Sequence, residues 1–176
     1  MSPMFTSTVS FLGKTACIAC IALLAACSPK FDWREVRGSA APFVVLLPAK
    51  PASHTRTINL DGIEVSMTMT AADVDGVMFA VGTAELPDEA RAQQALAAMK
   101  TALVRNIGGS VRKETVSAPG ALPRTINIEA AGAESRVLFG RFVANGRHIY
   151  QVIAVGKENA LPPEAVDTFL TSFKIN

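Results

Sequence analysis

The segment Asp61-Gly62-Ile63-Glu64-Val65-Ser66-Met67-Thr68-Met69-Thr70 decides the fold class. Apolar and polar residues alternate from Ile63 to Thr70, which is the pattern of a β-strand with one buried and one solvated face. Asp61-Gly62 favours a two-residue turn in which both residues have positive φ. Residues 55–60 then form the other arm of a hairpin. The segment therefore predicts an antiparallel sheet.

The two methionines of this strand allow three interpretations. Met67 and Met69 lie two residues apart on the apolar face. Thioether side chains are polarizable and adaptable, so the pair is compatible with an adaptable binding surface or with a site for a soft metal. Because Ile63 and Val65 share this face, core packing is the interpretation that the pattern favours.

Further strands are predicted on both sides of the hairpin. Residues 43–47 form a short apolar run that ends at Pro48, and residues 77–84 are apolar on both faces. Strands are also predicted at 111–116, 125–130, 136–143 and 148–155. The last two are joined by Asn145-Gly146, a second type I′ turn signal. Since both arms of this hairpin are apolar at nearly every position, we expect it at the centre of the sheet.

One long and one short helix complete the predicted domain. Asp88 is a favoured N-cap residue, and Gly108-Gly109 favour the end of a helix. Apolar residues recur between them at helical spacing, at Ala92, Ala95, Leu96, Met99, Leu103 and Ile107. A short helix is predicted over 164–172. We therefore expect a single α+β domain over residues 43–176, with an antiparallel β-sheet packed between the long central helix and the short C-terminal helix.

The first 26 residues have the pattern of an export signal. Residues 15–26 carry no charge, and Lys14 precedes them. Twelve apolar or small residues are too few to span a bilayer, which needs about 20. Leu24-Ala25-Ala26-Cys27 resembles the lipobox of bacterial lipoproteins. This resemblance implies cleavage before Cys27 and acylation of that cysteine with palmitate or a similar chain, whereas the alternative is an ordinary cleaved signal.

The residues after Cys27 indicate which membrane holds the lipoprotein and what links the anchor to the domain. In enteric lipoproteins an Asp at the next position is associated with retention at the inner membrane, so by resemblance Ser28 favours the periplasmic face of the outer membrane. Residues 28–42 are predominantly polar and are predicted to be a tether. Within it, Trp33 could anchor at the membrane interface or contact a partner. The favoured interpretation is that Phe31 and Trp33 fold back onto the domain as a short edge segment.

Length, charge and cysteine positions indicate a single domain and give no reason to expect a nucleic-acid partner. Removing residues 1–26 from the 176-residue chain leaves 150, the usual size of one domain. Loss of Lys14 takes the formal charge from +2 to +1, which gives no indication of nucleic-acid binding. Cys17 and Cys20 have the spacing of a redox pair, but both lie in the signal. We therefore expect a domain without disulfides.

No motif predicts catalysis. Ser110-Val111-Arg112-Lys113 matches an SxxK motif but enters a predicted strand, which would place Ser110 and Lys113 on opposite faces. Arg56, Arg124, Arg136 and Arg141 could line a polar sheet face and bind an anion, although solvated strand residues are the favoured interpretation.

No motif predicts a metal site either. Asp73, Asp75 and Gly76 resemble part of a calcium loop but are more simply a turn. His54 and His148 are the only histidines and have no ligand cluster beside them in the sequence, so zinc is not expected. The prediction is a chain with no catalytic residue, metal or cofactor.

The layout of the domain resembles the PsbP-like fold, which includes the DcrB-like bacterial lipoproteins. The resemblance rests on residues 43–48, Phe-Val-Val-Leu-Leu-Pro, on the pair Ile149-Tyr150, and on the closing segment Phe169-Leu170-Thr171-Ser172-Phe173. These are core positions, so the resemblance implies no catalytic residue. Related folds serve as assembly or stabilising factors for membrane complexes.

These features favour a non-enzymatic, membrane-anchored periplasmic lipoprotein that acts as a protein-binding or accessory module of an envelope complex. One alternative is a carrier or sensor of a small molecule or lipid held between sheet and helix. Another is a hydrolase whose residues meet only in three dimensions. The expected contacts are the membrane, through the lipid anchor, and an envelope protein, without nucleic acid.

Overall fold

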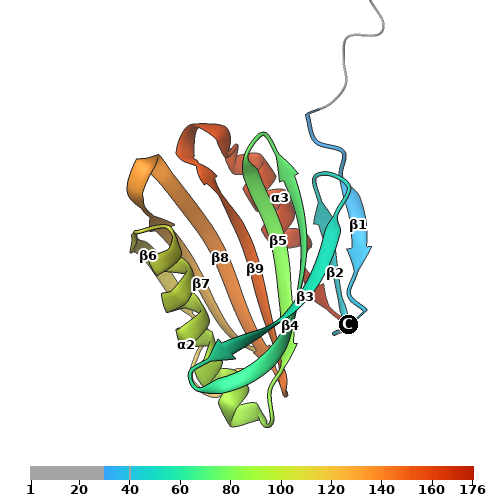
Figure 1. Cartoon of the computed structure of the whole chain (residues 1–176), viewed down its shortest axis with the longest axis vertical. Coiled ribbons are helices and arrows are strands. Elements are labelled where there is room, and N and C mark those ends of the chain that lie inside the picture. The colour runs from blue at the N-terminus through green and yellow to red at the C-terminus, as the bar shows by residue number, and fades with distance from the viewer. Residues whose placement is uncertain (1–29, 40) are drawn as a thin grey trace, which may run out of the picture. The chain divides into compact units, whose positions relative to one another are not determined.

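The computed structural model describes residues 30–39 and 41–176, of which residues 31–176 form one compact unit (Figure 1). The signal and the lipidation site, Leu24 to Cys27, lie outside the described residues. Neither helix of the described part is long and apolar enough to cross a membrane.

A seven-stranded antiparallel sheet forms the centre of this unit. In spatial order its strands are β3 (Ala52–Leu60), β4 (Ile63–Val74), β5 (Val77–Glu85), β9 (His148–Lys157), β8 (Arg136–Asn145), β7 (Arg124–Ala131) and β6 (Ser110–Val116). The prediction that the β8–β9 hairpin lies at the centre is confirmed. Along β9 the side chains alternate between two buried faces, with Ile149 on one and Tyr150 on the other, which explains the unbroken apolar run.

A second sheet was not predicted. It contains three strands in the order β1 (Arg34–Arg37), β2 (Phe43–Leu47) and β10 (Lys174–Ile175). The segment before Phe43 pairs with β2 instead of extending as a tether. Phe31 and Trp33 pack against the core, with the Trp33 ring 6.5 Å from that of Phe79. The fold-back interpretation is therefore confirmed, and the folded domain begins before the boundary predicted at Phe43.

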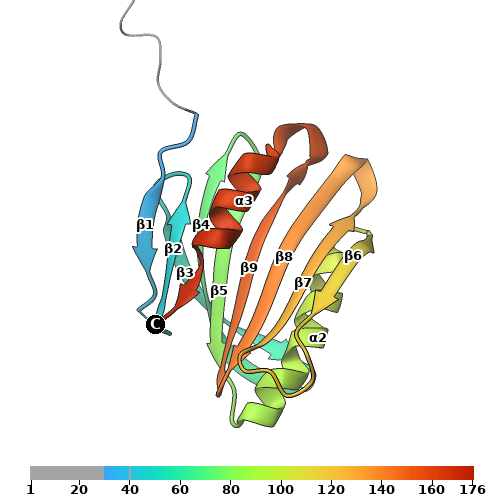
Figure 2. The same cartoon turned by 180° about the vertical axis from the view of Figure 1, so that it is seen from behind.

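The two α-helices of the described residues lie on opposite faces of the large sheet (Figure 2). Helix α2 (Glu89–Asn106) packs mainly on β8 and β9. Helix α3 (Pro163–Ser172) lies on the other face together with the small sheet. Two short 3-10 helices, η2 (Ala133–Ser135) and η3 (Glu158–Ala160), flank β8 and β9 in the sequence. The predicted α+β arrangement is confirmed at this level, with two antiparallel sheets instead of one.

Local chemistry explains the ends of these elements. The side chain of Asp88 accepts a hydrogen bond from the Arg91 backbone N–H at 2.8 Å, which makes it the predicted N-cap of α2. Asp61 and Gly62 have φ of 52° and 86°, as the predicted hairpin requires. The second turn was predicted one residue too early, because Asn145 pairs with His148 in the ladder. The turn residues there are Gly146 and Arg147.

Candidate binding groove

The structure changes the geometry of the SxxK motif. A β-bulge in β6 places Ser110 opposite Ala131 and Lys113 opposite Glu129, two positions apart on one face of β7. The prediction of opposite faces was wrong, because a bulge resets the alternation of side chains. Both residues are nevertheless exposed, and no hydrogen bond joins them. The motif therefore lacks the short serine–lysine contact that nucleophile activation requires.

The predicted turn at Asp73 is confirmed. Asp73 Oδ1 accepts a hydrogen bond from the Gly76 backbone N–H at 3.1 Å, which closes the β4–β5 turn. His54 lies in β3 and His148 begins β9. Within residues 30–39 and 41–176, no group of three or more His, Cys, Asp or Glu side chains is placed to hold a metal.

The four arginines do not form one surface. Arg56, Arg124 and Arg136 occupy register positions on the α2 face, on three different strands. Arg141 lies on the opposite face, in the middle of β8. The sequence alone could not assign each arginine to a face of the sheet, because the face on which a residue lies depends on strand register. Of these four arginines, Arg141 is the one whose side chain forms hydrogen bonds with the described residues.

Neutral groups hold the Arg141 guanidinium. Its Nε donates to Asn127 Oδ1 at 3.0 Å, and its Nη1 donates to the Leu170 carbonyl oxygen at 2.9 Å. Leu170 lies in the last turn of α3, where carbonyl groups lack helical partners and the helix dipole is negative. Arg141 therefore joins α3 to the sheet at the C-terminal end of the helix.

The positive charge of Arg141 has no carboxylate partner among the described residues. Exposed arginines elsewhere form ion pairs, for example Arg112 with Glu158 at 3.0 Å and Arg147 with Glu85 at 3.1 Å. Arg141 is half-buried, and among the described residues its side chain forms only two hydrogen bonds, both to neutral groups. Removing a cation from water without pairing it is costly. An anionic ligand would lower that cost.

A groove of about 490 Å³ opens beside this guanidinium. Its walls combine polar groups of β7 and β8 with apolar side chains of the closing segment. They comprise Pro123, Thr125, Asn127, Arg141, Val143, Asn145, Phe173, Ile175 and Asn176. A few directed polar groups among apolar walls are typical of ligand sites. We define these nine residues as the Arg141 groove.

From the sequence, Arg141 was one of four arginines that could bind an anion. A stronger signal was present, because Arg141 interrupts the apolar run Val137-Leu138-Phe139-Gly140-Arg141-Phe142-Val143 of a central strand. A charged side chain inside a strand that is otherwise buried indicates a specific partner. The partner, Leu170, is 29 residues away in the sequence and was not predictable.

Tyr150 is a buried ionisable group on the same face of the sheet. Burial raises the pKa of its phenol above the ordinary value. Its hydroxyl donates to the Pro42 carbonyl oxygen at 3.4 Å, and its ring contacts those of Phe43 and Phe173. Burial and these ring contacts make Tyr150 part of the core, and the raised pKa keeps its phenol neutral.

Comparison with known proteins found no matching protein-family model and no similar sequence among curated proteins.

Proposed function

We propose that this chain is a lipid-anchored lipoprotein of the bacterial envelope with a PsbP-like domain, and that the Arg141 groove binds an acidic group of an envelope protein. The observation that carries the proposal is the half-buried Arg141 guanidinium, which lies in an open groove and has no carboxylate partner within residues 30–39 and 41–176. A carboxylate of a partner protein would supply a charge-assisted, bidentate interaction. On this proposal the domain acts by binding and has no catalytic role.

The anchor rests on the sequence Leu24-Ala25-Ala26-Cys27. Acyl chains contribute about 0.8 kcal/mol per buried CH₂, so two or three chains hold a domain at a membrane stably. Cys27→Ala should abolish palmitate labelling and leave the precursor uncut. Labelling that persists in this variant would rule out the lipoprotein assignment. An Asp at position 28, introduced as Ser28→Asp, tests whether the outer membrane is the destination.

The PsbP-like part of the proposal rests on arrangement alone. A seven-stranded antiparallel sheet lies between a long helix and a short C-terminal one. The three segments that carry the resemblance contribute Phe43, Tyr150 and Phe173 to one aromatic cluster. Their meeting in three dimensions supports a common structural role for these segments.

Site-directed photo-crosslinking in cells tests the groove. A benzophenone amino acid at Asn145, which is exposed at the groove, should cross-link a partner protein. The same probe at Asn106, exposed at the end of α2 on the other face of the sheet, is the matched control. Equal cross-linking from both positions, or none from Asn145, would contradict the groove as the binding surface.

A charge substitution then tests the chemistry of recognition. Thr125→Glu places a carboxylate in the groove next to Arg141 and should abolish the Asn145 cross-link. Thr101→Glu, on the exposed surface of α2, should leave it unchanged.

A second candidate function is the binding of a small anionic molecule. The volume of about 490 Å³ falls within the range of about 300–1,000 Å³ that small-molecule sites occupy. Native mass spectrometry of the detergent-purified protein distinguishes this function. A bound small molecule that is lost in Thr125→Glu, without any protein cross-link, would replace the leading proposal.

A further inference from the structure

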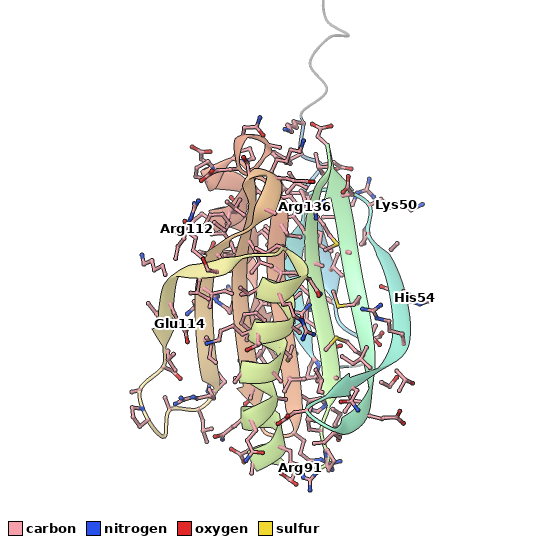
Figure 3. The ribbon with its side chains drawn as sticks, turned by 60° about the vertical axis from the view of Figure 1, so that its left-hand side comes forward. Lys50, His54, Arg91, Arg112, Glu114 and Arg136 are labelled. Carbon is pink, nitrogen blue, oxygen red and sulfur yellow. The ribbon has the colours of Figure 1, made fainter. Side chains whose placement is uncertain are left out.

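A separate cluster of soft ligands lies on the α2 face of the sheet. Helix α2 packs mainly on β8 and β9, and the β3–β4 hairpin extends beyond it. Figure 3 shows this face, with His54 on β3 and sulfur atoms between the hairpin and α2. The cluster is on the opposite side of the sheet from the Arg141 groove.

Strand register brings four residues into one row across the sheet. His54 pairs with Met69, Met69 pairs with Gly82, and Gly82 pairs with Gln151. Directly opposed residues of neighbouring strands place their side chains on the same face, with Cβ atoms about 4.5–5.5 Å apart. Met67 lies two residues from Met69 and therefore also on this face.

The two thioether sulfurs converge over Gly82. A Cβ at this glycine would lie 2.5 Å from Met69 Sδ and 3.5 Å from Met67 Sδ. The two sulfurs are therefore no more than 6.0 Å apart, the sum of those distances. Any larger residue at position 82 would displace the Met69 sulfur. The absence of a side chain at Gly82 therefore allows both sulfurs to lie beside it.

Core packing accounts for Met67 but not for the whole cluster. Met67 is 4% exposed, whereas Met69 is half-buried and His54 is exposed. The side-chain amide of Gln151, which is only 7% exposed, points its Nε2 at Met69 Sδ, 3.9 Å away. A buried amide directed at a sulfur fixes the orientation of the thioether, as outer partners do for metal ligands.

We propose that Met67, Met69 and His54 form a binding site for a soft monovalent cation, Cu⁺ or its analogue Ag⁺. Thioether and imidazole groups are ligands that Cu⁺ prefers, whereas hard cations require oxygen. The two methionine ligands lie on β4 with their sulfurs beside Gly82, and His54 on β3 is the register partner of Met69 on the same face. The site corresponds to the soft-metal interpretation of the methionine pair, to which the structure adds the convergence of the two sulfurs and His54 as a candidate third ligand in register with Met69.

Methionine-methyl NMR provides a test on the unaltered chain. Of the six methionines in the sequence, only Met67, Met69, Met78 and Met99 follow the proposed cleavage site, so a ¹³C-methyl-methionine spectrum of the detergent-purified protein has few signals. Thiols are first blocked with N-ethylmaleimide, because cysteines also bind these ions. Titration with Ag⁺ should shift the Met67 and Met69 methyl signals together and saturate at one ion per chain. No shift of these signals, or equal shifts of Met78 and Met99, would overturn the proposal.

Substitutions test the ligands one at a time. Met67→Leu and Met69→Leu conserve volume and are tolerated in cores, so the variants should fold. Each should weaken Cu⁺ binding at least about tenfold in anaerobic competition with bathocuproine disulfonate, as should His54→Gln. Met78→Leu, a methionine 36% exposed on neighbouring β5, is the control and should bind normally. Normal Cu⁺ binding by the Met67→Leu/Met69→Leu double variant would refute the site.

Gly82→Ala distinguishes an effect on Cu⁺ binding from an effect on the stability of the core. The added methyl group meets the end of the flexible Met69 side chain, which can move aside at small cost to stability. Because the sulfur leaves its position, Cu⁺ affinity should fall while the thermal unfolding midpoint stays close to that of the parent. An unchanged affinity in this variant would show that convergence over Gly82 is not used for binding.

Discussion

Arg141→Met tests how helix α3 is held on the sheet. The substitution keeps an unbranched apolar stem but removes the hydrogen bonds to Asn127 Oδ1 and to the Leu170 carbonyl. Hydrogen bonds from a charged donor contribute about 1.5–3 kcal/mol each when buried. Arg141 is only half-buried, so water can satisfy part of what is lost. We therefore expect the free energy of unfolding to fall by about 2 kcal/mol, a decrease of about 4–8 °C in midpoint for a domain of this size.

Urea denaturation measures the global loss, and amide hydrogen exchange locates it. Exchange should accelerate first in α3 and in β10, which follows directly and pairs with β2. Arg136→Met is the matched control, since Arg136 is exposed on the same strand and its side chain forms none of the hydrogen bonds or ion pairs found among the described residues. Its effect should stay within about 0.5 kcal/mol. Equal destabilisation by both substitutions, or unchanged exchange in α3, would refute the assigned role of Arg141.

Three further predictions concern single positions. Asp88→Ala removes the N-cap of α2 and should cost about 1 kcal/mol in urea denaturation, whereas Asp88→Ser should restore most of it. Gly132→Ala places a methyl group against the Ile107 carbonyl oxygen, which accepts from Ala133 N–H at the end of α2, and should lower the unfolding free energy by about 1–3 kcal/mol. For Tyr150, burial raises the pKa in the folded state, so the unfolded chain loses its proton first and stability falls as pH rises above about 10. In Tyr150→Phe the free energy of unfolding should fall less above about pH 10 than in the parent, as measured by urea denaturation at several pH values. An identical fall in both proteins would contradict the raised pKa of Tyr150.

The elements of this fold were predictable because each has a local cause. The alternation from Ile63 to Thr70 requires one buried face, and Asp61-Gly62 requires a tight turn, so the β3–β4 hairpin follows from ten consecutive residues. Asp88 similarly marks the start of α2 through a hydrogen bond to a residue three positions ahead. Interactions within a few residues leave a readable pattern in the sequence.

The second sheet and the candidate sites have no such local cause. β2 pairs with β10, which lies at the far end of the chain, and Arg141 bonds to a carbonyl 29 residues away. A β-bulge in β6 reversed the expected facing of Lys113, because one extra residue shifts every later side chain. The methionine pair was visible in the sequence, but its relation to His54 and Gln151 depends on pairing among four strands. Register and long-range pairing therefore determine both candidate sites.

The positions of the two candidate sites follow from the width of the sheet. Strands lie about 4.8 Å apart, so seven of them span about 29 Å, whereas a helix with its side chains is only about 10–12 Å wide. One helix on each face therefore covers two or three strands. Helix α2 packs mainly on β8 and β9, and the methionine cluster lies on the same face toward the β3 edge of the sheet. On the other face, α3 and the small sheet cover the middle strands, and the Arg141 groove opens over β7 and β8. Since the sites occupy opposite faces, the effects of Thr125→Glu and Met69→Leu should be independent, each changing one binding activity and leaving the other intact.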